Sequence, residues 1–448
     1  MSVRAERAVL AQVILPRSPY DADETLDELE NLARTAGAVV LGSVRQKRAK
    51  VDAKRYLGKG KAQELHDLCV AVGADVVIAD DQLTPAQVRT LEAEMDVKVV
   101  DRSEVILDIF AAHASTVQAQ LQVELAQLQY QFPRLKRMWT HLDRTAGGTV
   151  GGPAGGGIGV RGPGERQLEV DRRLVEHKIL DLKHKLETIA GRRHTMTTGR
   201  TDRFYSVALV GYTNAGKSSL MNALTGAGVS VADRLFETLD TRTRQWKLPD
   251  GTEMMLSDTV GFVRKFPPHL AASFHATLEE AHEADLLLHV IDASRHDSEQ
   301  EVHAVNTALK EVDCDRKPTL FVLNKVDLVD DLSELPLVRK LMGDVVCTSA
   351  VTGAGLDELQ QRVICRFQEG QGEFSIHAGA GDGRLIAFLL KNTHVLEQTY
   401  GDTAVEMRVR MDPALAGVIR NMGGRVEGAP AAPDAPAAPE APDAPEAR

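Results

Sequence analysis

The chain has 448 residues, of which 26% are charged and 43% hydrophobic, and its formal net charge is −11. This length predicts roughly two to four domains, and the composition excludes fibrous, wholly disordered and membrane-spanning classes. Four cysteines without CxxC spacing disfavour a zinc or disulfide framework, and with no visible signal peptide we expect a soluble, cytoplasmic protein.

Residues 1–110 alternate strand-like and helix-like segments, which predicts an α/β domain with a largely parallel sheet. The expected strands are Val9–Leu15, Ala38–Val44, Asp75–Asp80 and Val97–Val100, and the expected helices are Glu24–Thr35, Lys61–Val72 and Pro85–Met95. Thr84 and Gln87 have the spacing of a capping box at the start of the third helix. The string YLGKGK at Tyr56–Lys61 follows no clear strand, so we interpret it as a basic turn.

Basic residues are concentrated before residue 200. Arg45–Lys61 holds eight basic residues and one acidic residue, and Arg134–Arg200 holds fourteen and seven. A basic region on an acidic chain favours a polyanionic partner, most plausibly RNA. The alternative is an ordinary solvated surface.

Residues 111–200 carry two runs with helical spacing of apolar side chains. The first run is Leu121, Leu125, Leu128, Phe132 and Leu135, and the second is Leu168, Val175, Ile179, Leu182, Leu186 and Ile189. Two such helices joined by a loop predict an antiparallel hairpin. Pro133 is expected to kink or interrupt the first helix.

The loop of this hairpin, residues 144–164, is rich in glycine. Gly147–Gly164 contains ten glycines in eighteen residues, with arginines on both sides. Glycine permits close backbone approach to a ligand and arginine suits phosphate, so we predict an RNA-probing tip; a flexible tether is the alternative. The candidate RNA-binding residues are Arg144, Arg161, Arg166, Arg172 and Arg173.

Residues 203–367 are the predicted nucleotide domain, and their first motif is GYTNAGKS. It follows the apolar run Ser206–Val210 and precedes a helix-like segment, which is the setting of a phosphate-binding loop. Lys217 is expected to reach the terminal phosphates and the Ser218 hydroxyl to bind Mg²⁺. The loop residues are Gly211, Tyr212, Thr213, Asn214, Ala215, Gly216, Lys217 and Ser218.

Two further motifs suit the γ-phosphate and the metal ion. The first is Phe236, Glu237, Thr238, Leu239 and Asp240, in which the Thr238 hydroxyl is expected to complete the Mg²⁺ coordination. The second is Asp258, Thr259, Val260 and Gly261. Here the carboxylate would hold the Mg²⁺ shell through water and the Gly261 N–H would meet the γ-phosphate.

The last two motifs indicate the base. They are Asn324, Lys325, Val326 and Asp327, and then Ser349, Ala350 and Val351. Asp327 can accept two hydrogen bonds from guanine, which adenine does not offer. Five motifs in order, each after a predicted strand, predict a GTP-binding domain with a mostly parallel sheet.

The water-positioning group is not identified. Phe262 occupies the place of the glutamine that many such enzymes use, so we expect slow intrinsic hydrolysis that a partner accelerates. Asn214 suggests a K⁺ ion near the phosphates, although a loop-capping asparagine is an equal alternative.

The C-terminal part is predicted to hold a small α+β domain at residues 384–425. We expect a glycine-rich linker over Gln368–Gly383, a helix over Arg384–Thr399, a strand over Ala404–Met411 and a helix that Asp412 and Pro413 begin. Residues 427–448 contain almost only alanine, proline and acidic residues, which predicts a disordered tail.

The strings GYTNAGKSSL, LFETLD, DTVGFVRKFPPHLAASFHATLEE, NKVDL, YLGKGKAQEL and GGIGVRGPGERQLEVDRR resemble the HflX family of ribosome-associated GTPases, up to about residue 425. The resemblance implies GTP hydrolysis with Mg²⁺ and binding to the large (50S) ribosomal subunit and its RNA, with rescue or splitting of stalled ribosomes under stress. We expect a monomer without membrane insertion. The alternatives are a GTPase of ribosome assembly or tRNA metabolism, or a nucleotide-regulated RNA-binding protein with incidental hydrolysis.

Overall fold

The computed structural model describes residues 5–16, 18, 20–146, 163–198, 205–226, 236, 242–265, 280–295, 298–329, 345–401, 403–411, 413 and 415–428. The chain divides into two compact units, Met1–Leu356 and Asp357–Arg448. The predicted tail, residues 427–448, lies outside the described residues from position 429 onward. Among the described residues, no helix combines the length and the apolarity that a bilayer span needs.

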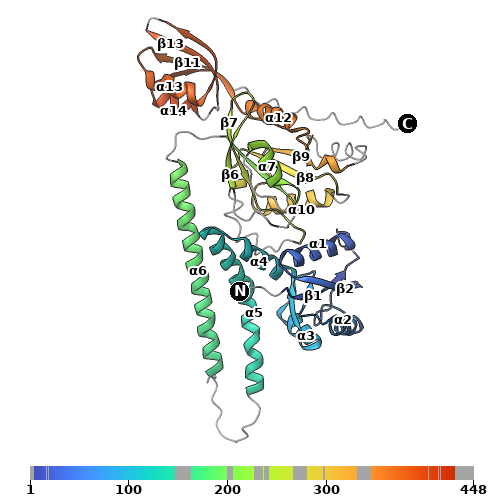
Figure 1. Ribbon diagram of the computed structural model, residues 1–448. Helices are drawn as coiled ribbons and strands as arrows, with labels where there is room; N and C mark the ends of the chain where they lie inside the picture. The colour runs from blue at the N-terminus through green and yellow to red at the C-terminus, as the bar shows by residue number, and fades with distance from the viewer. Residues whose placement is uncertain are drawn as a thin grey trace, which may run out of the picture. The chain divides into compact units, whose positions relative to one another are not determined.

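The N-terminal sheet has four parallel strands in the order β2-β1-β3-β4. Its strands β1 and β2 are labelled in Figure 1. The four strands are β1 (Arg7–Ile14), β2 (Val39–Lys47), β3 (Val76–Ala79) and β4 (Lys98–Asp101), and the helices are α1 (Ala22–Thr35), α2 (Lys59–Val72), α3 (Pro85–Met95) and α4 (Arg102–His113). One face packs on α2 and α3, the other on α1 and α4. The predicted parallel α/β arrangement is confirmed, including the capping box at Thr84.

Two details of this region differ from prediction. Lys59–Lys61 lie in the first turn of α2 rather than in a basic turn, and only the preceding residues form the turn. Tyr56 is fully buried there with a φ of 69°, and its hydroxyl donates to Asp81 at 2.8 Å. Helix α4 was not predicted, because it follows β4 directly, with Asp101 as its N-cap.

The long helices α5 (Val117–Ala146) and α6 (Pro163–Thr198) lie side by side and antiparallel, as the apolar spacing predicts (Figure 1). Lys178 of α6 pairs with Glu124 of α5 at 2.7 Å. The expected interruption at Pro133 is wrong, because α5 continues through this residue.

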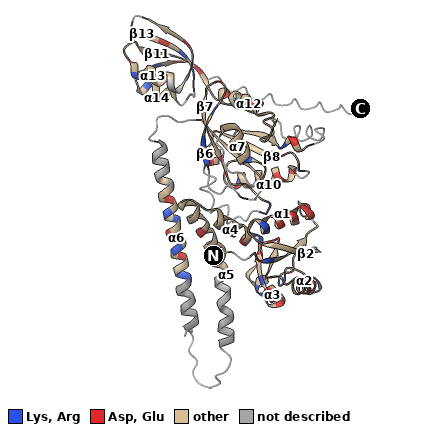
Figure 2. Ribbon diagram, viewed as in Figure 1, with Lys and Arg blue, Asp and Glu red and all other residues tan. Residues whose placement is uncertain are grey.

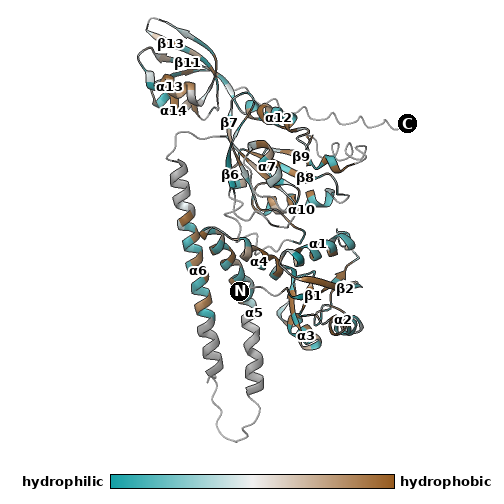
Figure 3. Cartoon of the chain, viewed as in Figure 1, coloured by the Kyte–Doolittle hydropathy of each residue, from teal (hydrophilic) through white to brown (hydrophobic). Residues whose placement is uncertain are grey.

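The second sheet of the first unit has the order β10-β9-β8-β5-β7-β6, with β6 antiparallel at its edge. Its strands are β5 (Ser206–Gly211), β6 (Arg242–Lys247), β7 (Glu253–Asp258), β8 (Leu286–Asp292), β9 (Thr319–Asn324) and β10 (Val345–Cys347), with helices α7 (Lys217–Thr225) and α10 (Ser298–Glu311). Every residue of β8 is buried, as expected for a central parallel strand covered on both faces. Figure 3 colours the chain by hydropathy, with hydrophobic residues in brown.

The second unit contains α12, which runs from Leu356 to Glu369, and then an antiparallel sheet with the order β12-β13-β11-β14. The elements are β11 (Gly372–Gly379), α13 (Gly383–Asn392), β12 (His394–Tyr400), β13 (Ala404–Met411), α14 (Leu415–Asn421) and β14 (Arg425–Glu427). This is a split β-α-β arrangement. The predicted strand Ala404–Met411 is confirmed.

Two predictions in this unit are wrong. The expected linker Gln368–Gly383 contains β11, because alternate side chains such as Phe374 and Ile376 are buried against the two helices. The expected helix Arg384–Thr399 ends at Asn392, and β12 follows it and pairs with β13. In both cases long-range strand pairing outweighs the local pattern.

Candidate nucleotide site

The GYTNAGKS segment connects the carboxyl end of β5 to the N-terminus of α7, as predicted. Glycine is needed at both ends of the turn. A Cβ on Gly211 would lie 2.2 Å from the Val290 carbonyl oxygen. Gly216 has a φ of 91°, and a Cβ there would lie 2.3 Å from the Asn324 side-chain nitrogen. The loop therefore directs the first amides of α7 toward a bound anion.

Lys217 folds back over this loop. Its Nζ donates to the carbonyl oxygens of Gly211 at 3.1 Å and Tyr212 at 2.8 Å. Burial lowers the pKa of Lys217 to about 8, while the carboxylates of Asp258 and Glu301 oppose this shift. An ammonium group has three donors, so one remains for a phosphate.

Oxygen groups suited to Mg²⁺ gather beside this lysine. The Ser218 hydroxyl donates to the Asp258 carboxylate at 2.5 Å, and Asp258 is buried at the end of β7. Hydroxyl and carboxylate oxygens are the ligands that Mg²⁺ prefers, so these residues fit the ion. Glu237, Thr238, Leu239 and Asp240 lie outside the described residues; Phe236 is buried with its ring 4.7 Å from that of Phe110.

The segment after Asp258 is paired with the phosphate loop. The Thr213 N–H donates to the Phe262 carbonyl oxygen at 2.8 Å, and the Phe262 N–H donates to that of Gly211 at 3.1 Å. Between them, Gly261 lies directly against Thr213 and Lys217. Thr259 donates to the Leu209 carbonyl oxygen at 2.7 Å, and Val260 is buried.

Phe262 itself is 4% exposed and belongs to the hydrophobic core. Its ring has no donor or acceptor and is enclosed by apolar side chains. The ring therefore offers no group that could orient an attacking water.

Asn324 joins the base-binding motifs to the phosphate loop. Its amide donates to the Ala215 carbonyl oxygen at 3.0 Å and accepts from the Ala350 N–H at 3.1 Å. Lys325 pairs with Asp292 at 2.8 Å. Asp327 is exposed on a short 3₁₀ helix, Val326–Leu328, at the carboxyl end of β9.

The second base motif occupies the loop after β10. Ser349 is buried and its N–H donates to the Ala354 carbonyl oxygen at 2.9 Å, whereas Val351 is 83% exposed. The four motifs that the structure describes thus meet at the carboxyl ends of parallel strands, where open α/β sheets bind ligands. The bridging role of Asn324 had no sequence signal beyond its place in the motif.

His289 on β8 lies buried behind the phosphate loop, and the sequence did not single it out. Burial, and then the charge of Lys217, lower its pKa to about 3. Between pH 6.5 and pH 3 the unfolded chain binds a proton at this histidine and the folded protein does not. The free energy of unfolding therefore decreases as the pH falls through this range.

We therefore expect His289→Gln to reduce acid destabilisation. Between pH 7 and pH 5 the wild-type protein should lose about 2 kcal/mol more unfolding free energy than the variant, since the unfolded histidine binds a proton over that range. Guanidinium unfolding at the two pH values measures this difference. Equal losses in both proteins would show that His289 titrates normally.

The basic regions are partly neutralised in the structure. Within Arg45–Lys61, ion pairs engage four of the eight basic residues, namely Arg45, Arg48, Arg55 and Lys61. On α6, Arg172 pairs with Glu176 at 2.8 Å and lies over the Phe132 ring, and Arg173 is exposed. Further lysines follow along α6, where Figure 2 shows basic residues in succession.

Of the other candidate RNA-binding residues, the structure describes only the backbone of two. Arg144 lies in α5 and Arg166 lies in α6, whereas Arg161 lies outside the described residues. The structure therefore leaves the RNA-binding prediction untested. The described residues contain no group of three or more His, Cys, Asp and Glu side chains that could hold a metal ion.

Three family models match the chain. They are described as GTP-binding GTPase N-terminal (residues 23–111), GTP-binding GTPase Middle Region (residues 113–200) and 50S ribosome-binding GTPase (residues 206–325). Together they cover the N-terminal region from residue 23 onward, the helical hairpin and most of the nucleotide sheet.

Curated relatives are similar over most of the chain. GTPase HflX of Magnetococcus marinus is 42% identical over 92% of this chain and 94% of the relative, and that of Escherichia coli is 41% identical over 91% and 93%. Among solved structures, the crystal structure of SsGBP in complex with GDP is 26% identical, covers 81% of this chain and 98% of that chain, and has a TM-score of 0.46.

Proposed function

Because the chain belongs to the HflX family of GTPases and is a GTP-hydrolysing enzyme, we propose that it acts on the large ribosomal subunit in the cytoplasm, where it splits or rescues stalled ribosomes under stress. GTP cleavage to GDP and phosphate would set its affinity for the subunit. The GTPase fold typically requires Mg²⁺, and here we assign the ion to Ser218 and Thr238.

One observation carries this proposal: the N-terminal sheet and the nucleotide site share a hydrophobic core. Phe110 of α4 packs on Phe236, and the same cluster contains Tyr212 of the phosphate loop and Phe262. Helices α1 and α4 of the N-terminal region are therefore packed against the phosphate loop and the segment that follows Asp258. Such packing suits a protein that converts nucleotide state into binding of a polyanion.

The test is GTP hydrolysis with and without purified large subunits. We expect stimulation of at least about 100-fold, because Phe262 leaves the water-positioning role to a partner. Small subunits serve as the control. A rate that large subunits leave unchanged would contradict the proposal, and stimulation by tRNA or an assembly precursor alone would favour the alternative functions.

The contact surface can be tested on α6. Lys183→Glu together with Lys185→Glu should weaken large-subunit binding at least tenfold and leave basal hydrolysis unchanged, since both residues are exposed on α6 and belong to none of the nucleotide-binding motifs. Lys310→Glu on α10 is a matched control with the same change of charge per site. Equal binding by the wild-type protein and the double variant would exclude this face.

We also propose that K⁺ assists hydrolysis through Asn214. This residue is exposed in the phosphate loop with a φ of 61°, and its side chain is short and polar. We expect hydrolysis to be severalfold faster in potassium than in sodium buffer, and Asn214→Ala to remove the difference. Equal rates in the two buffers would leave Asn214 as an ordinary loop residue.

A further inference from the structure

The phosphate loop makes a buried polar contact with the N-terminal sheet's helices. The Tyr212 hydroxyl donates to the Glu28 carboxylate of α1 at 2.5 Å and accepts from the Arg264 N–H at 2.7 Å. Tyr212 is 2% exposed and Glu28 5%. One hydroxyl thus joins three segments: α1, the phosphate loop and the residues just after Phe262.

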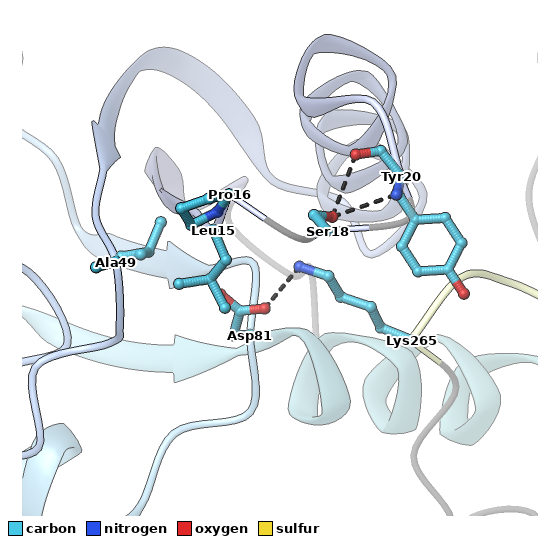
Figure 4. A pocket seen from close by; sticks show the side chains of 8 residues that line it. Leu15, Pro16, Ser18, Tyr20, Ala49, Asp81 and Lys265 are labelled. Atoms are coloured by element: carbon cyan, nitrogen blue, oxygen red, sulfur yellow. Dashed lines mark hydrogen bonds and ion pairs between the residues drawn. The ribbon is translucent and has the colours of Figure 1, made fainter.

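The two residues that follow Val263 bind four carboxylates of the N-terminal region. The fully buried Arg264 pairs with Glu24 at 3.1 Å and lies 3.9 Å from Glu28. Lys265 contacts Asp80 at 2.8 Å and Asp81 at 2.6 Å. Figure 4 shows its ammonium group directed at Asp81, beside a pocket at the carboxyl end of β1.

Arg102 of α4 closes this set of contacts. Its guanidinium group binds Asp80 at 2.9 Å and also Glu28, and only 2% of the residue is exposed. Burial opposes its charge, but the carboxylates of Glu28 and Asp80 prevail and raise its pKa. We call the set the cross-sheet network; its members are Glu24, Glu28, Asp80, Asp81, Arg102, Tyr212, Arg264 and Lys265.

Such a network tolerates little displacement. Removing or moving one charge leaves its buried partners uncompensated, which costs more than a surface ion pair gains. The network begins at Arg264, three residues after Gly261, and includes Tyr212 beside Thr213. The network therefore holds both segments whose backbones hydrogen-bond to each other, the phosphate loop and the segment that contains Phe262.

We propose that Tyr212 and Lys265 are positioning residues for GTP hydrolysis, through which the N-terminal sheet and its helices fix the Gly261–Phe262 backbone beside the γ-phosphate. Neither residue touches the reacting atoms. Their effect is confined to GTP, because GDP has no γ-phosphate for the Gly261 N–H to meet. The inference concerns the hydrolytic step alone and does not depend on the ribosomal proposal.

The test compares single-turnover GTP cleavage, GTP affinity and GDP affinity in the full-length chain without ribosomes. Tyr212→Phe removes only the hydroxyl and keeps the ring in the core, and Lys265→Met removes the charge. We expect each to slow cleavage about tenfold and to change GDP affinity less than twofold. Lys265→Arg, which keeps the charge, should restore most of the rate.

Arg55→Met is the matched control for Lys265→Met. It also removes a half-buried cation that pairs with a carboxylate, Glu94 at 2.5 Å, but neither residue of this pair belongs to the cross-sheet network. We expect a similar loss of thermal stability with cleavage unchanged. Unchanged cleavage in Tyr212→Phe and Lys265→Met, or GTP and GDP affinities that fall in parallel, would overturn the proposal.

Discussion

Asp327→Asn is expected to change the base preference of this GTPase from guanine to xanthine. A carboxylate accepts from the ring N–H and the exocyclic amine of guanine, whereas an amide offers one acceptor and one donor. Xanthine has a carbonyl in place of that amine, so the amide suits it. The variant's GTP affinity should fall roughly 1,000-fold, less than fully buried sites reach, because Asp327 is exposed.

The Asp327→Asn substitution should affect base recognition alone, because the neighbouring residues keep the backbone of this segment in place. Asn324 and Lys325 are held by the phosphate loop and Asp292, so the 3₁₀ helix that carries Asp327 keeps its place. Competition of GTP, XTP and ATP against a fluorescent nucleotide measures the preference. Asp315→Asn, exposed in the turn before β9, is the matched control, and retained GTP selectivity in Asp327→Asn would contradict the assignment.

Gly261→Ala is expected to abolish most hydrolysis while GDP still binds. A Cβ at this position would lie 2.8 Å from the Thr213 Cα and 3.0 Å from the Lys217 Nζ. The Thr213 backbone cannot move aside as a flexible side chain can. The segment that contains Gly261 must therefore shift away from the phosphate loop. Misplacing a group that positions the substrate by about 1 Å lowers the rate of cleavage roughly 100-fold.

Single-turnover cleavage and GDP affinity separate the two effects. GDP affinity should change little, because the shifted amide serves only the γ-phosphate. Gly60→Ala in α2 is the control, since a Cβ there meets nothing within 4 Å. A Gly261→Ala protein that cleaves GTP at the normal rate would show that this amide is not used.

Local sequence patterns predicted those elements whose conformation depends on residues close to them in the sequence. The parallel N-terminal sheet, the paired long helices and the phosphate loop between β5 and α7 all follow from apolar periodicity or glycine spacing. Such signals also placed Lys217 at the start of α7, and Asp258 and Asn324 at strand ends. The glycine-rich segment before residue 384 misled, because β11 is defined by pairing with β13 rather than by its composition.

The sequence by itself therefore determined the class of the site, a guanine-nucleotide loop with Phe262 in place of a catalytic glutamine. Only the tertiary structure decided what Phe262 and its neighbours contact. Tyr212 binds Glu28 and Arg264 binds Glu24, partners 184 and 240 positions away. No periodicity or spacing encodes such pairs, because a buried charge is defined by the partner that folding brings to it.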